Sequence, residues 1–279
     1  ARSHATSHGT VTAGAFSPMP VRKKQKLSPK ASSADIEDLG KKAPPLWKET
    51  LSMIKEARAA QKGSAPVDTD GCERQGDEAA SPEDYRFQTL IACMLSSQTK
   101  DPVTADAVAT LKKQPGGLTV ASMLATPEDR LDKLIGKVGF HRNKARFIKN
   151  TVEILRDLWS MDIPDSVEGL VALPGVGPKM AHLTMNIAWG IPSGICVDVH
   201  VHRISNRLGW VKTKQPEETR LALEQFVPED EWIPINPLLV GWGQTVCTPI
   251  NPDCGDCPVR ANCKRVGVKL TKAEQASSQ

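Results

Sequence analysis

The stretch Leu173–Met185, LPGVGPKMAHLTM, decides the fold of this chain of 279 residues. Gly175 and Gly177 separate an apolar helical turn from a second helical pattern that follows them. Glycine at both positions permits a tight turn that brings backbone N–H groups close to a charged surface. The N-terminus of the second helix adds a positive dipole end, which suits a phosphate. The stretch therefore predicts a helical hairpin, which serves either as an ordinary helix–helix turn or as a phosphate site.

The chain on both sides of the hairpin repeats apolar residues at helical spacing. These stripes are Trp47, Leu51 and Ile54; Phe87, Leu90, Ile91 and Met94; Val103, Ala107, Val108 and Leu111; Leu131, Leu134 and Ile135; and Phe147, Ile148, Val152 and Leu155. Another helix is expected from Pro216, because proline followed by two acidic residues is typical of a first helical turn. ICVDV at 195–199 alternates like a strand but is too short to found a sheet. The sequence predicts an all-α fold.

Four cysteines near the C-terminus have the spacing of a metal site, C-x6-C-x2-C-x5-C. They are Cys247, Cys254, Cys257 and Cys263. Four thiolates in so short a segment can hold either an iron–sulfur cluster or a tetrahedral zinc. One close pair flanked by two single cysteines suits a cluster better than the two close pairs of most zinc modules. The three remaining cysteines, an odd number without a signal peptide, indicate a reducing compartment.

Two ionisable residues follow the hairpin at short range. Lys179 stands two residues after Gly177, and Asp198 comes nineteen residues after Lys179. Lys179 is either a surface lysine that contacts phosphate or a nucleophile. Asp198 precedes an expected helix over 199–208, where a carboxylate commonly acts as the N-cap. A capping role and a catalytic role are compatible at this position.

In this order, hairpin, lysine, aspartate and four cysteines, the chain resembles the endonuclease III family of DNA base-excision glycosylases over roughly residues 84–267. The stretch PKMAH is similar to the eukaryotic branch. The resemblance implies two helical lobes, a helical barrel with a helix-hairpin-helix motif and an iron–sulfur cluster lobe, with DNA in the cleft between them. It implies a [4Fe–4S] cluster on the four cysteines. Double-stranded DNA with a damaged base or an abasic site is the implied partner, and a monomer is expected.

The resemblance also implies the chemistry of the pocket. Lys179 would attack the sugar C1′, displace the base and form an iminium ion, from which loss of a C2′ proton expels the 3′ phosphate. The amine must be uncharged for this, so we expect burial and the helix dipole to lower its pKa from about 10.4. Asp198 would stay ionised near the sugar and stabilise positive charge there. Val199 stands where the family commonly has threonine.

An enzyme that acts on a base must extrude it and fill the gap that it leaves. By resemblance, Gln98 fills this gap, Phe140 is a second wedge and His200 supports the flipped nucleotide. Each could equally be a structural residue: a loop glutamine, a half-buried aromatic or a helix-surface histidine. The remaining DNA contacts expected are Arg142 and Lys144 near Phe140, and Arg260, Lys264 and Arg265 around the last cysteine. The last three are invoked because the loop TPINPD at 248–253 lacks Lys and Arg.

The charge of the chain is uneven. Residues 1–45 carry eight Lys/Arg and three Asp/Glu, whereas the remainder carries 28 basic and 29 acidic residues. Within them, VRKKQKLSPK at 21–30 is a basic run of the nuclear-import type. The first fifteen residues contain several Ser and Thr but no acid, which is compatible with the remnant of a transit peptide. We therefore expect a nuclear protein, with the mitochondrion as a second location.

The expected organisation follows composition and the resemblance. It comprises a disordered basic tail at 1–45, an N-terminal helix at 46–62 that packs with the cluster lobe, a mobile loop at 63–83, a barrel domain at 84–194, a cluster domain at 195–267 and a disordered tail at 268–279. No apolar run is long enough to span a bilayer, so a soluble protein without a membrane partner is expected.

The resemblance predicts a bifunctional DNA glycosylase and abasic-site lyase that excises oxidised pyrimidines in base excision repair. Two alternatives remain. One is a monofunctional glycosylase of the same superfamily, against which Lys179 argues, as does the expected lack of a recognition domain after Gly267. The other is a non-catalytic helix-hairpin-helix module that binds DNA and carries a structural metal.

Overall fold

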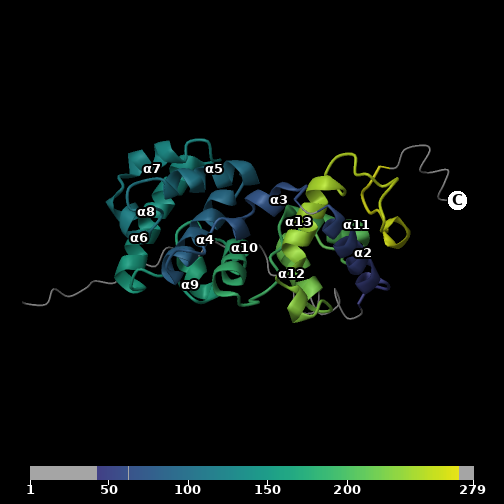
Figure 1. The fold of residues 1–279 in the computed structure, drawn as a ribbon. Coiled ribbons are helices and arrows are strands. Elements are labelled where there is room, and N and C mark those ends of the chain that lie inside the picture. Colours follow the sequence, from purple (N-terminus) through teal and green to yellow (C-terminus); the bar gives the residue numbers. More distant parts are fainter. Residues whose placement is uncertain (1–42, 62, 270–279) are drawn as a thin grey trace, which may run out of the picture.

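The structure, a computed structural model, describes residues 43–61 and 63–269, and every regular element in them is helical. The all-α prediction is therefore confirmed. The helices form two lobes side by side, joined in the middle of the molecule (Figure 1). None of the helices in the described part is long and apolar enough to cross a membrane. The predicted disorder of both tails falls on residues that lie almost wholly outside the described ones.

The first lobe comprises α4 to α10 and packs around one central helix. Its elements are α4 (Pro82–Ser96), α5 (Asp101–Lys112), α6 (Val120–Ala125), α7 (Glu128–Leu134), α8 (His141–Leu158), α9 (Val167–Ala172), α10 (Pro178–Thr184) and the π turn η2 (Met185–Trp189). Every residue from Phe87 to Leu95 of α4 is buried. A helix segment that is buried on all sides must be surrounded, and α5, α8, α10 and η2 pack against α4. Ser81 caps α4 by accepting a hydrogen bond from the Asp84 N–H (3.2 Å).

The second lobe combines the first described helix with the last part of the chain. It contains α2 (Trp47–Ala60), α11 (Val199–Leu208), α12 (Pro216–Glu224), η3 (Glu229–Glu231), α13 (Ile235–Thr245) and η4 (Arg260–Asn262). Trp47, Leu51 and Ile54 of α2 share one buried core with residues of α11 to α13. The Trp47 ring meets Phe226 edge to face, with 5.3 Å between centroids. The amphipathic α2 is thereby fixed to segments about 150 residues or more further along the chain.

The segment 63–83, for which the sequence predicts a mobile loop, instead contains two short helices between the lobes. These are α3 (Pro66–Asp70) and the 3₁₀ turn η1 (Cys72–Arg74). The Gln244 side chain of α13 accepts a hydrogen bond from the Val67 N–H (3.0 Å) and donates one to Asp101 of α5 (2.8 Å). Gln244 therefore connects this segment to both lobes, which composition alone does not reveal.

Candidate active site

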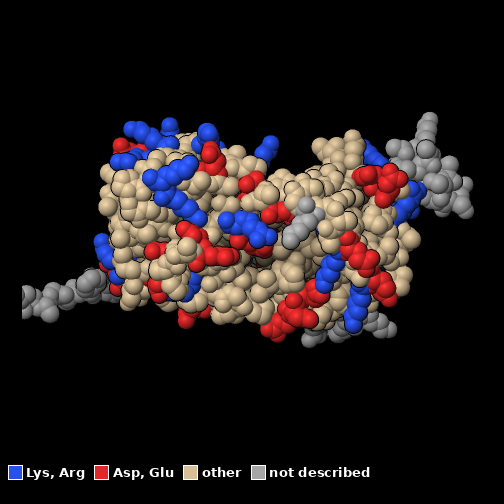
Figure 2. All heavy atoms as spheres, viewed as in Figure 1, with Lys and Arg blue, Asp and Glu red and all other residues tan. Residues whose placement is uncertain are grey.

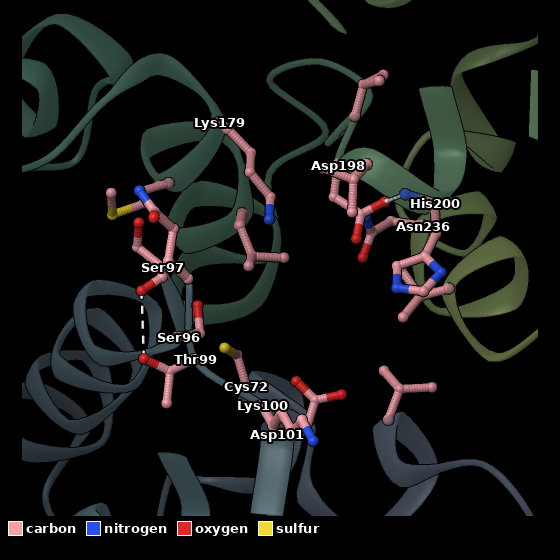
Figure 3. A pocket seen from close by; sticks show the side chains of 18 of the residues that line it. Cys72, Ser96, Ser97, Thr99, Lys100, Asp101, Lys179, Asp198, His200 and Asn236 are labelled. Atoms are coloured by element: carbon pink, nitrogen blue, oxygen red, sulfur yellow. Dashed lines mark hydrogen bonds between the residues drawn. The ribbon is translucent and has the colours of Figure 1, made fainter. Parts of the chain in front are cut away.

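A cavity of about 810 Å³ lies between the two lobes. Its walls come from α3 and η1, from the turn between α4 and α5, and from α10, α11 and α13. Lys179 reaches it from the first lobe and Asp198 from the start of α11, and the two side chains face one another across the space (Figure 3). The structure thus brings together the two residues to which the sequence assigns chemistry.

The glycine hairpin places Lys179 in this cavity. Gly175 has a φ of +79°, and a Cβ built there would lie 2.4 Å from the Phe147 ring. Only glycine avoids both the backbone strain and the clash at this position. Gly177 is the N-cap residue of α10, and a Cβ there would meet nothing in the free protein. Pro178 begins the helix, so Lys179 is its second residue and projects from the first turn.

The charge around Lys179 differs from the sequence-based expectation. Burial is the largest influence on the pKa of Lys179 and acts to lower it, whereas the Asp198 carboxylate acts to raise it. Burial also raises the pKa of the Cys196 thiol to about 12, so Cys196 is uncharged at neutral pH. Burial therefore acts on Lys179 as predicted, but Asp198, which the prediction did not include, opposes it by stabilising the ammonium form.

Asp198 is the N-cap residue of α11. Its Oδ1 accepts hydrogen bonds from the backbone N–H groups of His200 and Val201, both at 2.8 Å. These bonds orient the carboxylate at the cavity wall and stabilise its charge. Val199, the next residue, is 68% exposed, so an apolar side chain lies open beside the carboxylate. The His200 ring lines the same wall, and burial lowers its pKa.

Gln98 and Phe140 lie close together at one side of the cleft. Both line a second pocket of about 190 Å³, which also contains Gly175 of the hairpin. Phe140 is 61% exposed, and both residues have a left-handed backbone, with φ of 51° for Gln98 and 59° for Phe140. An exposed aromatic in a rarely adopted conformation is unusual in a stable fold. Their roles as wedge residues stay predictions.

The structure does not place Lys144 at the surface. Its side chain is buried (6% exposed), and its Nζ donates hydrogen bonds to Leu95 O, Ser97 O and the Thr99 hydroxyl. The predicted phosphate contact is therefore wrong, because all three donors of the ammonium are used inside the protein. Arg142 is exposed near Phe140 and remains a candidate for a phosphate contact.

The predicted basic contacts on either side of Cys263 belong to the second lobe and do not line the central cavity. Lys264 is exposed, and its aliphatic stem packs over Gly209. Arg260 and Arg265 are partly buried, and the Arg265 N–H donates a hydrogen bond to the Cys263 sulfur (3.3 Å). DNA contact by these three residues stays a prediction.

The four cysteines of the motif surround one small cavity, which they line together with residues of α11 and α13. Burial raises the pKa of Cys257 to about 11 and also raises that of Cys263. Within residues 43–61 and 63–269, the structure contains no group of three His, Cys, Asp or Glu side chains close enough together to bind a single ion. Four thiols around a shared space fit a metal centre with several attachment points, since such a centre supplies the positive charge that thiolates need.

Arg207 of α11 holds the loop that carries the first of these cysteines. Its guanidinium donates hydrogen bonds to Thr248 O (2.6 Å), Pro249 O (2.8 Å) and the Cys247 sulfur (3.5 Å). Arg207 was not predicted from the sequence, and neither were Lys100, Gln244 and Cys72, which line the central cavity. No motif marks these residues, because their partners lie in distant parts of the chain.

Fold and site together define a two-lobed helix-hairpin-helix protein with a lysine and a carboxylate in the cleft. The family model of the HhH-GPD superfamily base excision DNA repair proteins matches residues 91–229, which include the hairpin, Lys179 and Asp198. The chain is 53% identical over 222 residues to Endonuclease III-like protein 1 of Mus musculus, covering 79% of this chain and 73% of the relative. It is 47% identical to Endonuclease III homolog 1, chloroplastic, of Arabidopsis thaliana, of which it covers 59%.

A solved structure of a trapped endonuclease III–DNA covalent intermediate is similar, with a TM-score of 0.65 and 28% identity. The match covers 78% of this chain and 95% of that one. A non-covalent endonuclease III–DNA complex matches with the same TM-score and 27% identity. The chain belongs to the endonuclease III family, and it is a base excision repair DNA glycosylase and abasic-site lyase.

Proposed function

We propose that this chain excises oxidised pyrimidines from double-stranded DNA and then cleaves the strand, with Lys179 as the nucleophile and Asp198 as its charged partner. One observation carries this assignment: a lysine and a carboxylate from different lobes face each other in a cavity large enough for a nucleotide. The oxidised pyrimidine as substrate rests on family membership and not on a particular residue of the pocket.

The reaction uses Lys179 twice. In its neutral form the amine attacks C1′, and the bond between C1′ and the base breaks, so that the base leaves with the electron pair and gains a proton. Opening of the sugar ring converts the adduct into an iminium ion, which makes the C2′ proton acidic. Loss of that proton breaks the C3′–O bond and expels the 3′ phosphate. One covalent intermediate therefore serves both base removal and strand cleavage.

Asp198 acts on the charge that develops in these steps. Its carboxylate is fixed by two backbone N–H groups, so it needs no reorganisation when positive charge appears on the sugar. Because it raises the pKa of Lys179, it also keeps the free protein in the ammonium form. A proton must therefore leave Lys179 before attack, and the nearby carboxylate is the acceptor that we assign to it.

DNA is held by the hairpin and the two loops beside it. The hairpin backbone at Gly175 and Gly177 would contact phosphate, while Gln98 and Phe140 enter the space of the extruded base. Figure 2 shows basic side chains gathered over the part of the first lobe that contains α5, α7 and α8. We expect a monomer on DNA, since both chemical groups come from one chain.

Cys247, Cys254, Cys257 and Cys263 would hold a [4Fe–4S] cluster. The four thiols surround a space and do not meet at a point, and a four-iron cluster binds each cysteine to a different iron. The cluster supplies a cross-link between the C-terminal loops and α11, which Arg207 reinforces. The lysine reaction itself requires only residues of the cleft. A tetrahedral zinc on the same cysteines is the alternative.

Location is proposed from the tail alone. The basic run at 21–30 would direct the chain to the nucleus, and the acid-free first fifteen residues are compatible with import into mitochondria.

Trapping with borohydride on an abasic duplex tests the proposal. Reduction of the iminium ion should leave wild-type protein covalently attached to DNA, and Lys179→Gln should form no adduct while its Kd for DNA changes less than about tenfold. A monofunctional glycosylase would excise bases without an adduct, and a binding module would do neither. Near wild-type nicking by Lys179→Gln would refute the assignment of the nucleophile.

A panel of duplexes, each with one defined lesion, then tests the preference for oxidised pyrimidines.

A further inference from the structure

We infer that Lys144 is a positioning residue that holds the loop around Gln98 in the shape needed to enter DNA. The inference rests on the gap-filling role proposed above for Gln98. Lys144 lies in the first turn of α8, and its Nζ donates hydrogen bonds to Leu95 O (2.7 Å), Ser97 O (2.6 Å) and the Thr99 Oγ1 (3.2 Å). These acceptors lie 45 to 49 residues before Lys144 and belong to a single turn of chain.

The C-terminal end of α4 explains why an ammonium is bound here. The last carbonyls of a helix lack partners within the helix and form its negative dipole end. Lys144 supplies donors and a positive charge at that end, where the chain leaves α4 toward Gln98. Burial lowers the pKa of Lys144 to about 8, so the group is mainly protonated at neutral pH. The three oxygens further favour the charged form.

The bonds fix both neighbours of Gln98 and leave its side chain exposed. Ser97 and Thr99 each bind Lys144, and the Thr99 hydroxyl also donates to Ser97 O (3.2 Å; Figure 3). Gln98 itself has a φ of 51°, a left-handed conformation that residues other than glycine rarely adopt. Such conformations persist only where the surroundings hold them. Without Lys144 we expect this turn to relax and Gln98 to lose its direction.

The same bonds reach the second wedge residue. The Thr99 Oγ1 accepts a hydrogen bond from the Gly139 N–H (3.2 Å), and a Cβ at Gly139 would lie 2.6 Å from Gln98 O. Phe140 follows directly, with its own left-handed backbone. Lys144 and Thr99 therefore join the Gln98 and Phe140 loops into one rigid unit.

Lys149 provides a matched control on the same helix. Its Nζ donates to Met123 O (2.8 Å), Leu124 O (2.8 Å) and Thr126 O (2.7 Å) at the end of α6, and it lines neither of the two cleft pockets. Lys144→Met and Lys149→Met each remove one ammonium that caps a helix end. Both variants should lower the Tm by several degrees, so stability alone does not separate them.

The readouts are single-turnover nicking of a lesion duplex and the fluorescence of 2-aminopurine placed beside the lesion, which increases when base stacking is disrupted. We expect Lys144→Met to lower the rate about 100-fold and to lose most of the fluorescence change. Lys149→Met should remain within about twofold of wild type in both. Thr99→Val, which keeps the side-chain shape, should act in the direction of Lys144→Met and replaces it if that variant does not fold.

A double-mutant cycle shows whether Lys144 acts through Gln98. If it does, Lys144→Met combined with Gln98→Ala should be no slower than the slower of the two single variants. The inference would be overturned if the two reductions in rate multiply in the double variant. It would also be overturned if Lys144→Met and Lys149→Met show the same rate and the same fluorescence change. Wild-type rates for Gln98→Ala would also overturn the inference. The proposed function would still stand in that case if the wild-type protein forms the borohydride-trapped adduct with DNA.

Discussion

Lys179 has a charge in the free protein that its proposed chemistry cannot use. The Asp198 carboxylate contributes to the raised pKa of the amine, yet the attack on C1′ requires the neutral form. The same carboxylate stabilises the positive charge that appears later on the sugar. Asp198 therefore acts against the first step and in favour of the following ones, so its removal should change both the rate and its pH dependence.

Asp198→Asn separates capping from electrostatics. Below the pKa of Lys179 the neutral fraction increases with pH, so the rate increases with pH. Removing the carboxylate lowers that pKa, and the rising limb should therefore shift to lower pH. The maximal rate should fall about 100- to 1,000-fold, because a fixed charge near the sugar is lost. Asparagine caps a helix about as well as aspartate, so an unchanged rate and pH profile would show that Asp198 only caps α11. Single-turnover rates across pH, with the Tm as a control for folding, make this measurement.

At the scale of elements, the two hairpin glycines have different structural demands. Gly175→Ala introduces a Cβ 2.4 Å from Phe147 at a φ of +79°, and we expect a loss of roughly 1–3 kcal/mol in the free energy of unfolding. Gly177→Ala meets open space and should leave stability unchanged. If the hairpin backbone approaches phosphate, however, Gly177→Ala should weaken DNA binding, because the methyl group stands in the way. Denaturant unfolding and DNA titration of both variants test this; equal DNA affinity of Gly177→Ala and wild type would contradict a close approach.

If the proposed cluster is present, the second lobe should depend on the four cysteines that would hold it and not on the other three. Serine in place of Cys247, Cys254, Cys257 or Cys263 should reduce soluble yield. It should also abolish the absorbance at about 400 nm that an iron–sulfur cluster would give. The same replacement at Cys72, Cys93 or Cys196 should leave the absorbance unchanged. Spectra and iron content of protein purified without oxygen check this, and stoichiometric zinc without iron would contradict a cluster.

The sequence predicted those features whose determinants lie within short windows. The hairpin, Lys179 and the cysteine spacing each occupy a few neighbouring residues, and the expected helix at 199–208 matches α11. The helices of 63–83 were missed, since the Val67 N–H binds Gln244, which lies 177 residues away. Lys144 was assigned to phosphate for the same reason: its charge is visible in the sequence, but its three buried acceptors are not.

For the whole molecule, the net positive charge comes from residues 1–45, since the remaining residues carry slightly more acidic than basic side chains. Deleting residues 1–45 removes the entire surplus, and we expect weaker binding to damaged and undamaged duplex alike, with a flatter dependence on salt. Cleavage at saturating protein should not change, because no proposed catalytic residue precedes Gln98. Salt titrations of the 279-residue chain and of the truncated protein check the tail, and an unchanged slope would show that it does not contact DNA. Substituting the lysines of 21–30 alone tests the import signal by the distribution of the protein in cells.

The sharing of one core by α2 and the C-terminal helices has a consequence for biosynthesis. The first lobe is contiguous in the chain, so it can complete its packing while the ribosome is still translating the rest. Helix α2 is made earlier, but its partners on α11 to α13 emerge more than a hundred residues later. During that interval Trp47, Leu51 and Ile54 have no partner and are a natural target for chaperones that bind apolar segments. Truncations that remove α11 to α13 should therefore expose the apolar face of α2 as well.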